Sequence, residues 1–184
     1  MVPGRNHQGS SATSERKKPR GTARDRALNL LSFRDRSRRE IEQRLLRAGY
    51  EPDEVVDAIE GLERVGLVDD DRYARAVVEQ QAGRRLSGRR AVAAALFAKG
   101  VDRATAEAAL QEIDAPGAER ERADELARSR AGRMRELPPE VAFRRLSGLL
   151  ARRGYPPAVC REAARIALAH EISGIDDRSD DDPT

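Results

Sequence analysis

The sequence has no tryptophan, a single cysteine and few aromatic residues, and each shortage excludes a kind of architecture or chemistry. Aromatic residues make up 3% of the 184 residues whereas charged residues make up 36%, so the core cannot depend on large aromatic anchors. We expect instead many small aliphatic side chains buried along an extended surface, as in helical repeat proteins. The lone Cys160 excludes an intramolecular disulfide and a cysteine-rich metal site.

Long apolar runs are also missing. No stretch approaches the roughly 18 apolar residues that a transmembrane helix needs, so the sequence predicts no contact with a membrane. The first residues are polar and basic and lack the apolar region of a secretory signal. We therefore expect a cytoplasmic protein.

The two ends of the chain carry unbalanced charge and have little to bury. Residues 1–23 are rich in Gly, Ser, Pro and basic residues, and residues 173–184 are acidic. Because such compositions cannot bury enough apolar surface to fold, we predict a disordered basic arm and a disordered acidic tail. The net charge of the whole chain is only +3, and this value hides the opposite charges of the two ends.

Glycines punctuate the interior of the chain at the ends of amphipathic stretches. Between them the apolar residues recur at the three- and four-residue spacing of a helix, and no stretch alternates with a period of two. The pattern predicts an all-α fold, with each glycine in the left-handed conformation that ends a helix. The predicted stops are Gly49, Gly66, Gly83, Gly100 and Gly154.

Three of these stops belong to a repeat. Residues 45–50 match residues 96–101 and again residues 150–155, at spacings of 51 and 54 residues. A short turn follows each matched segment and leads into another helix. Where this turn contains proline, the proline suits the first turn of that helix. Units this small cannot bury an apolar face alone, so we predict nine helices in one elongated, curved array of three three-helix repeats. The expected units are residues 24–66, 67–114 and 115–172.

The second helix of each unit carries the basic charge. Residues 80–101 and 141–161 contain no acid, whereas the third helix of the first unit is acidic. Because equivalent helices of a repeat array lie on equivalent sides, charge is sorted by face, which favours an anionic partner. The predicted basic face consists of Arg39, Arg47, Arg84, Arg85, Arg89, Arg90, Lys99, Arg144, Arg145, Arg152 and Arg153.

In the first unit the second helix carries charges of both signs. Arg38 can pair with Glu42, and Glu40 with Arg44, one helical turn away.

The tyrosines and phenylalanines occupy repeat-equivalent or heptad-like positions, which predicts core residues and no base-stacking platform. Contact with nucleic acid would then be to backbone phosphate, sensitive to salt and weakly selective for sequence.

No residue pattern indicates catalysis. Asp69–Asp71 could suggest a magnesium site, but the triplet precedes a predicted helix that an aspartate can cap. Cys160 takes the apolar repeat position of Val55 and Ala106, which predicts a core residue. The sequence has no base paired with a nucleophile, no Walker A loop and no dinucleotide fingerprint. We therefore predict no enzyme activity, no metal site and no cofactor.

Residues 66–74, Gly-Leu-Val-Asp-Asp-Asp-Arg-Tyr-Ala, resemble the signature of the RecX regulatory family. The flanking stretches at residues 36–41 and 87–90 fit the same family. The resemblance spans residues 24–170 and is strongest in the first two units.

The resemblance implies both a fold and a partner. RecX-like proteins consist of three tandem three-helix repeats in an elongated, curved molecule. They lie in the groove of the RecA–DNA filament, suppress the RecA ATPase and strand exchange, limit filament growth and bind DNA. We therefore expect a monomeric regulator of RecA in DNA repair, recombination and the SOS response. It would contact single- and double-stranded DNA through phosphate.

Two other interpretations stay open. Three-helix units can resemble helix-turn-helix DNA-binding proteins, which read base edges with one recognition helix. Against this, Gln43 is the only amide among the second helices. A plain helical scaffold, with charge that only solvates its surface, is the other possibility.

Overall fold

The structure, a computed structural model, describes residues 20–176 and the side chains of residues 20–171. Across residues 20–176 all regular secondary structure is helical, in three groups of three α-helices, so the predicted all-α fold of three tandem three-helix units is confirmed. The helices are α1 (Ala23–Phe33), α2 (Arg38–Ala48), α3 (Pro52–Arg64), α4 (Asp70–Val78), α5 (Arg89–Ala98), α6 (Arg103–Gln111), α7 (Ala118–Ala131), α8 (Pro139–Arg152) and α9 (Pro157–Asp176).

The limits of the units and of the two tails stay predictions. Most of the predicted basic arm (residues 1–23) and much of the predicted acidic tail (residues 173–184) lie outside the described residues. Within the described range α1 begins at Ala23 and α9 continues to Asp176.

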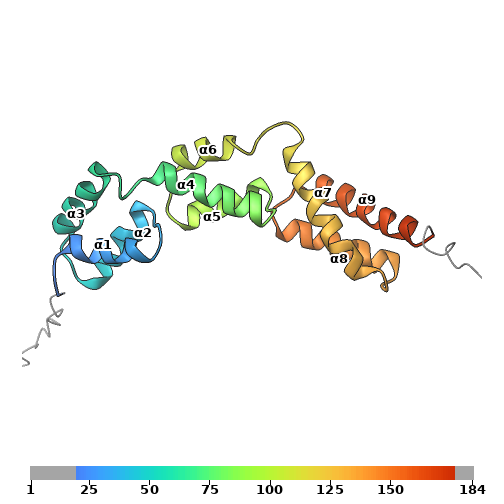
Figure 1. The fold of residues 1–184 in the computed structure, drawn as a ribbon, viewed down its shortest axis with the longest axis horizontal. Coiled ribbons are helices and arrows are strands. Elements are labelled where there is room, and N and C mark those ends of the chain that lie inside the picture. Colours follow the sequence, from blue (N-terminus) through green and yellow to red (C-terminus); the bar gives the residue numbers. More distant parts are fainter. Residues whose placement is uncertain (1–19, 177–184) are drawn as a thin grey trace, which may run out of the picture.

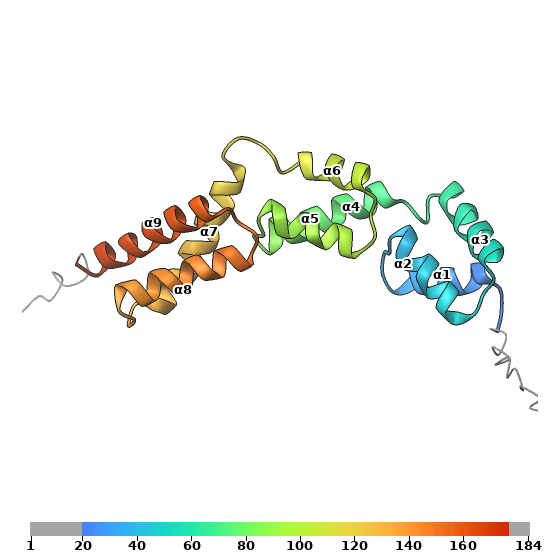
Figure 2. The same cartoon turned by 180° about the vertical axis from the view of Figure 1, so that it is seen from behind.

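The three units follow one another in an elongated, arched molecule (Figure 1). In this view α6 and α9 lie along the upper edge while α5 and α8 lie along the lower edge, and the reverse view keeps the same order (Figure 2). In the first unit α3 lies at the outer end, with α2 facing the second unit. In the second and third units the second helices and the third helices therefore occupy different sides of the array.

Each unit buries its own hydrophobic core. The first is built around Ile41 and Leu62, the second around Leu96 and Leu110, and the third around Leu146 with its neighbours. Three separate cores are typical of a repeat array, because each unit packs its own three helices together and contacts only its neighbours.

Cys160 is 3% exposed and belongs to the third core, so its prediction as a core residue is confirmed. Burial raises the pKa of the Cys160 thiol, which keeps it in the unreactive protonated form.

The aromatic prediction is only partly correct. The three tyrosines are buried. Phe33, however, is 80% exposed and Phe97 is 47% exposed, so the prediction that they are core residues is wrong. Phe33 is the last residue of α1. Phe97 follows the buried Leu96 by one residue, which turns it about 100° away from the core side of α5.

The left-handed helix stops are confirmed at four of the five predicted glycines. At Gly49, Gly66, Gly100 and Gly154 the backbone angle φ lies between 70° and 94°. Gly83 is the exception, because it lies inside η1 (Glu79–Arg84), a π-helix that continues α4 without a stop.

The chain reverses instead at Leu86, whose φ is 48°. The left-handed conformation costs a residue with a side chain about 1 kcal/mol or more. Leu86 is held there because its side chain packs against the core of the third unit and its carbonyl accepts a hydrogen bond from the Tyr155 hydroxyl at 2.7 Å. A strained residue of the second unit is therefore fixed by the third.

The aspartate triplet has structural roles. Asp69 caps α4, where its carboxylate accepts a hydrogen bond from the Arg72 amide at 2.8 Å. The Asp70 carboxylate accepts one from the Arg38 amide at the start of α2, also at 2.8 Å. The predicted capping is confirmed, and Asp70 adds a link between the first two units.

The described residues offer neither a metal-ligand cluster nor a membrane-spanning helix. No group of three or more His, Cys, Asp or Glu side chains among them could hold a metal ion. Within the same part of the chain, every helix is too short or too polar to cross a membrane.

Candidate nucleic-acid interface

The second helices α2, α5 and α8 are joined end to end at two junctions. At the first junction the Ser37 hydroxyl, which starts α2, donates a hydrogen bond to the Lys99 carbonyl at the end of α5, at 2.5 Å. At the second junction the Gly88 amide, which starts α5, donates to the Arg153 carbonyl at the end of α8, at 2.8 Å. The repeated contact sets the three basic helices in one row.

Glycine makes this close approach possible. A Cβ atom at Gly154 would lie 2.5 Å from the Ala91 amide nitrogen, and one at Gly88 would lie 2.7 Å from the Gly154 carbonyl oxygen. At the first junction a Cβ at Gly100 would instead overlap the aliphatic stem of Arg39. The second junction is therefore closed by backbone against backbone, and the first by backbone against a side chain.

The first junction also contains a half-buried ion cluster centred on Glu40, whose side chain is 15% exposed. The carboxylate accepts hydrogen bonds from Arg34 at 2.9 Å, from the Tyr73 hydroxyl at 3.0 Å and from Lys99 at 3.4 Å. Partial burial acts to raise the pKa of Glu40, but hydrogen bonds from Arg34 and Tyr73 and the Lys99 charge outweigh it and lower the pKa to about 2. Glu40 is therefore a structural anion that compensates two cations.

This cluster replaces the pairing expected from helix spacing. The predicted pairs within α2, Arg38 with Glu42 and Glu40 with Arg44, are wrong. Glu40 turns toward the second unit, and Arg38 pairs with Glu63 of α3 at 2.9 Å. For both Arg38 and Glu40, the partners in the structure lie outside α2.

The second junction is held by backbone carbonyls. The Arg153 guanidinium donates to the Arg85 carbonyl at 2.5 Å, next to the hydrogen bond between Tyr155 and Leu86. Burial raises the pKa of Tyr155 to about 12, so its hydroxyl remains a donor. These contacts leave the positive charge of Arg153 uncompensated, because the acceptor is neutral.

Arg89 is compensated within the chain. Its guanidinium pairs with Glu107 at 2.7 Å and with Asp114 at 3.0 Å, and its amide donates to the Glu119 carboxylate at 2.8 Å. These acids lie in α6, after it, and in α7. Arg89 therefore links α5 to the third helix of its own unit and to the third unit.

The predicted basic residues divide by whether an acid neutralises them. Lys99 pairs with Glu40, and Arg84 pairs with Glu79 at 3.8 Å, although both side chains of the latter pair are at least 74% exposed. The others, apart from Arg89, have no acidic partner among the described residues. They are Arg39, Arg47, Arg85, Arg90, Arg144, Arg145, Arg152 and Arg153.

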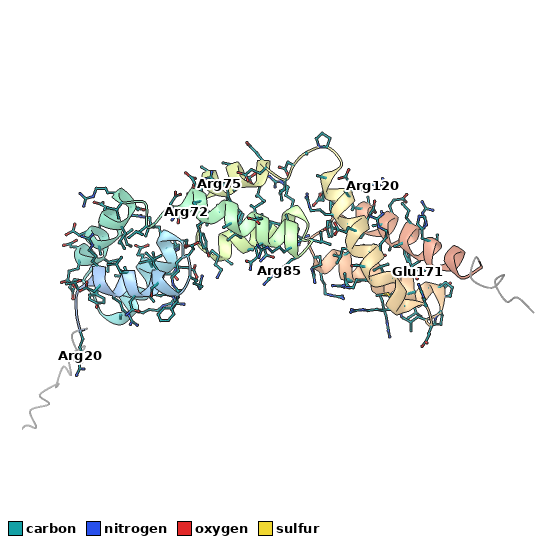
Figure 3. All side chains as sticks on the ribbon, in the orientation of Figure 1. Arg20, Arg72, Arg75, Arg85, Arg120 and Glu171 are labelled. Atoms are coloured by element: carbon teal, nitrogen blue, oxygen red, sulfur yellow. The ribbon has the colours of Figure 1, made fainter. Side chains whose placement is uncertain are left out.

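The structure brings four of the predicted residues together at the second junction. They line a hollow of about 650 Å³, called here the second hollow, which opens between η1, the loop before α5, α7 and the end of α8. Figure 3 shows Arg85 on the lower edge of the molecule, where α5 meets α8. The four are Arg84, Arg85, Arg152 and Arg153.

The remaining predicted residues lie elsewhere. Arg90 lines a different hollow, together with Arg89, Glu107 and Glu119. Arg39 and Arg47 lie on α2, and Arg144 and Arg145 lie on α8, toward the two ends of the row.

Sequence reasoning missed a fifth cation of the second hollow, Arg130. It belongs to a first helix, α7, whose net charge is small, so the pattern of basic second helices does not include it. Alignment of the first helices could have found it. The buried residues Ala74 and Val78 occupy the repeat positions of Ala123 and Ala127. In the same alignment Arg130 occupies the position of Gln81.

Three tandem three-helix domains around separate cores define a helical repeat protein. Family models match each of them by description: the RecX first three-helix domain at residues 23–62, the second at residues 69–110 and the third at residues 118–164. Together they cover more than half of the chain, and the chain belongs to the RecX family.

Individual relatives agree with this assignment. The regulatory protein RecX of Mycolicibacterium smegmatis is 38% identical over 153 residues, which covers 81% of each chain. That of Mycobacterium avium is 41% identical over 151 residues, 81% of this chain and 86% of the relative. The crystal structure of RecX from Lactobacillus salivarius superposes with a TM-score of 0.67 at 23% identity, over 79% of this chain and 94% of that one. The family is thus one of regulatory proteins.

Proposed function

We propose that this protein regulates the RecA recombinase by binding in the groove of the RecA–DNA filament. Binding there would inhibit the RecA ATPase and strand exchange and limit filament growth, without a cofactor or a catalytic step of its own. The protein would act as a monomer in the cytoplasm during DNA repair and recombination. Membership of the RecX family supports the RecA partner.

The observation that carries the proposal is the row of second helices. An elongated array can follow a long helical groove, and arginines without acidic partners along α2, α5 and α8 provide charge for the phosphates within it. Arginine is suited to this role because its planar guanidinium binds phosphate oxygens in pairs.

The direct test is the single-strand-dependent ATPase of RecA, titrated with this protein at fixed DNA and salt. We expect turnover to fall to a plateau as the protein saturates the filament. Unchanged turnover at saturating protein would overturn the proposal. A sequence-selective footprint on duplex DNA without RecA would favour the helix-turn-helix alternative instead.

Charge reversal on α8 separates the proposal from a plain scaffold. Arg144→Glu with Arg145→Glu changes two exposed side chains that have no ion pair in the described structure. We expect the concentration for half-maximal inhibition to rise at least tenfold, with helical content unchanged. The matched control reverses Arg128 and Arg161, which are exposed and lie outside the second hollow, and should change it less than threefold. Equal effects of both pairs would leave only a general charge requirement.

A further inference from the structure

The two junctions contain equivalent hollows with different charge. The first hollow, of about 430 Å³, lies between the loop before α2, α4, η1 and the end of α5. Its position corresponds to that of the second hollow one unit later, and the lining residues match by repeat position. Val77 corresponds to Leu126, and Lys99 corresponds to Arg153.

Acids compensate the cations of the first hollow. Arg34, Arg84 and Lys99 line it, but so do Asp35 and Glu79. Glu40 also accepts hydrogen bonds from Arg34 and Lys99 beneath it, as described above. The positive charge of this hollow is therefore balanced by contacts within the chain.

The second hollow is less compensated, because among its described cations only Arg84 has an acidic partner, the exposed Glu79 at 3.8 Å. Five arginines line it, and no carboxylate of the described residues does: Arg84, Arg85, Arg130, Arg152 and Arg153. Guanidinium groups that share one concave site repel one another, and a concave surface lined by charge of one sign concentrates the field they create. An anion in the hollow would relieve that repulsion.

The backbone fixes this arrangement before any ligand binds. Leu86 takes its strained conformation between Arg85 and Ser87, and η1 places an extra residue in the helix turn just before it. The Arg153 side chain is anchored on the Arg85 carbonyl. Strained residues and π-helical turns are concentrated at functional sites, and here both lie on the rim of the hollow.

We infer that the second hollow binds phosphates of the DNA backbone, and that the first hollow does not. The inference rests on the proposed function for the identity of the polyanion and adds the place where it binds. A linear polyanion fits better than an isolated anion because the cations continue along α8. Arg145 lies seven residues before Arg152, on the same helix face and about 10 Å away along the axis.

The test exchanges the residues of one junction for those of the other. Arg130→Gln with Arg152→Ala installs the residues found at the equivalent positions, Gln81 and Ala98. Binding to a fluorescein-labelled single strand and to a duplex is measured by anisotropy without RecA, from 50 to 200 mM salt. We expect at least tenfold weaker binding. For each phosphate that the variant no longer neutralises, the slope of log K against log salt should become smaller by about 0.7 on the single strand and about 0.9 on the duplex.

The control Arg128→Gln with Arg161→Ala removes the same charge outside the hollow. It should change affinity less than twofold and leave the slope unchanged. Equally weakened binding in both variants, or an unchanged slope in the exchange variant, would overturn the inference. The inference would also be wrong if poly-glutamate displaced DNA as well as poly-phosphate does at the same charge concentration. The hollow would then accept any polyanion.

The outcome is independent of the RecA assay. If the wild type leaves RecA turnover unchanged, the proposed function fails while the DNA slopes still decide the hollow. If the exchange variant still inhibits RecA but keeps the wild-type slope, the hollow assignment fails and the proposed function stands.

Discussion

The two junctions of this molecule share one geometry and differ in how their charges are satisfied. In both, the start of a second helix donates to the last carbonyl of the next second helix. The first adds a carboxylate, Glu40, that holds a guanidinium, an ammonium and a phenol together. The second uses the neutral carbonyls of Arg85 and Leu86. A repeat can therefore keep its assembly contact while the two copies differ in internal charge compensation.

The largest expected effect comes from disturbing the backbone contact of the second junction. Gly154→Ala combines a positive φ of 87° with a Cβ 2.5 Å from the Ala91 nitrogen, so the free energy of unfolding should fall by about 3 kcal/mol. Gly100→Ala meets the Arg39 side chain, whose Cβ would lie 2.7 Å away, and should cost about 2 kcal/mol, because the outer part of that side chain can rotate away although its Cβ cannot. Urea denaturation followed by circular dichroism gives both values.

Gly66→Ala is the reference for strain alone, because a Cβ there would contact nothing within 4 Å at a φ of 70°. It should cost about 1 kcal/mol. Equal destabilisation at Gly154 and Gly66 would contradict the backbone closure of the second junction.

The next effect distinguishes the ion cluster of the first junction. Glu40→Gln leaves Arg34 and Lys99 without their carboxylate and should lower the free energy of unfolding at pH 7 by about 2 kcal/mol. Glu42→Gln, on the same helix without an ion pair in the described structure, should change it by less than about 0.5 kcal/mol.

The same carboxyl predicts a pH dependence. The pKa of Glu40 in the folded protein is about 2, below its ordinary value of 4.5. A lowered pKa means that the unfolded chain binds the proton first, so the stabilisation is complete above about pH 4.5 and is lost as the pH falls toward 2. The difference in thermal midpoint between wild type and Glu40→Gln should shrink over that window. A constant difference from pH 6 to pH 2.5 would contradict the cluster.

A smaller effect is expected from the tyrosine of the second junction. Tyr155→Phe removes the hydrogen bond to the Leu86 carbonyl and should cost about 1 kcal/mol. Because Leu86 is then less restrained, amide hydrogen exchange should accelerate at residues 84–88 more than at residues 34–38. Uniform acceleration across both loops would show that Tyr155 stabilises only the core.

The smallest effect is on the exposed pair next to the second hollow. Glu79→Gln removes the partner of Arg84, and since both side chains are largely exposed, stability should change by less than about 0.5 kcal/mol. Freed of the acid, Arg84 should strengthen DNA binding about twofold at low salt, and the gain should vanish above about 0.5 M salt. Weaker DNA binding of Glu79→Gln would argue against Arg84 as a ligand residue.

Local signals were enough to predict the repeat, and contacts between units were not predictable from them. Gly49, Gly100 and Gly154 mark helix ends because the left-handed conformation is costly for other residues, so their spacing reported the architecture. Gly83 is also a glycine, but it lies inside a π-helix. The left-handed residue is Leu86 instead, which is held there by its packing on the next unit.

The candidate site shows the same limit. The acid-free stretches include Arg85 and Arg152, and both line the second hollow. The same rule also selected Arg89, whose acids lie 18 or more residues away in sequence, and it missed Arg130. For Arg89 and Lys99, the compensating acids lie outside the helix that carries the cation.

The end-to-end contact has a direction, and the last unit cannot continue it. Ser37 and Gly88 each provide a hydrogen-bond donor at the start of a second helix. The residue that caps the start of α8 is Pro138, which has no amide hydrogen and no side-chain donor. A head-to-tail contact of this kind would otherwise let one copy dock the end of its α2 onto the α8 of another and grow into a fibre. Proline at this position offers no donor for a further contact of the same kind.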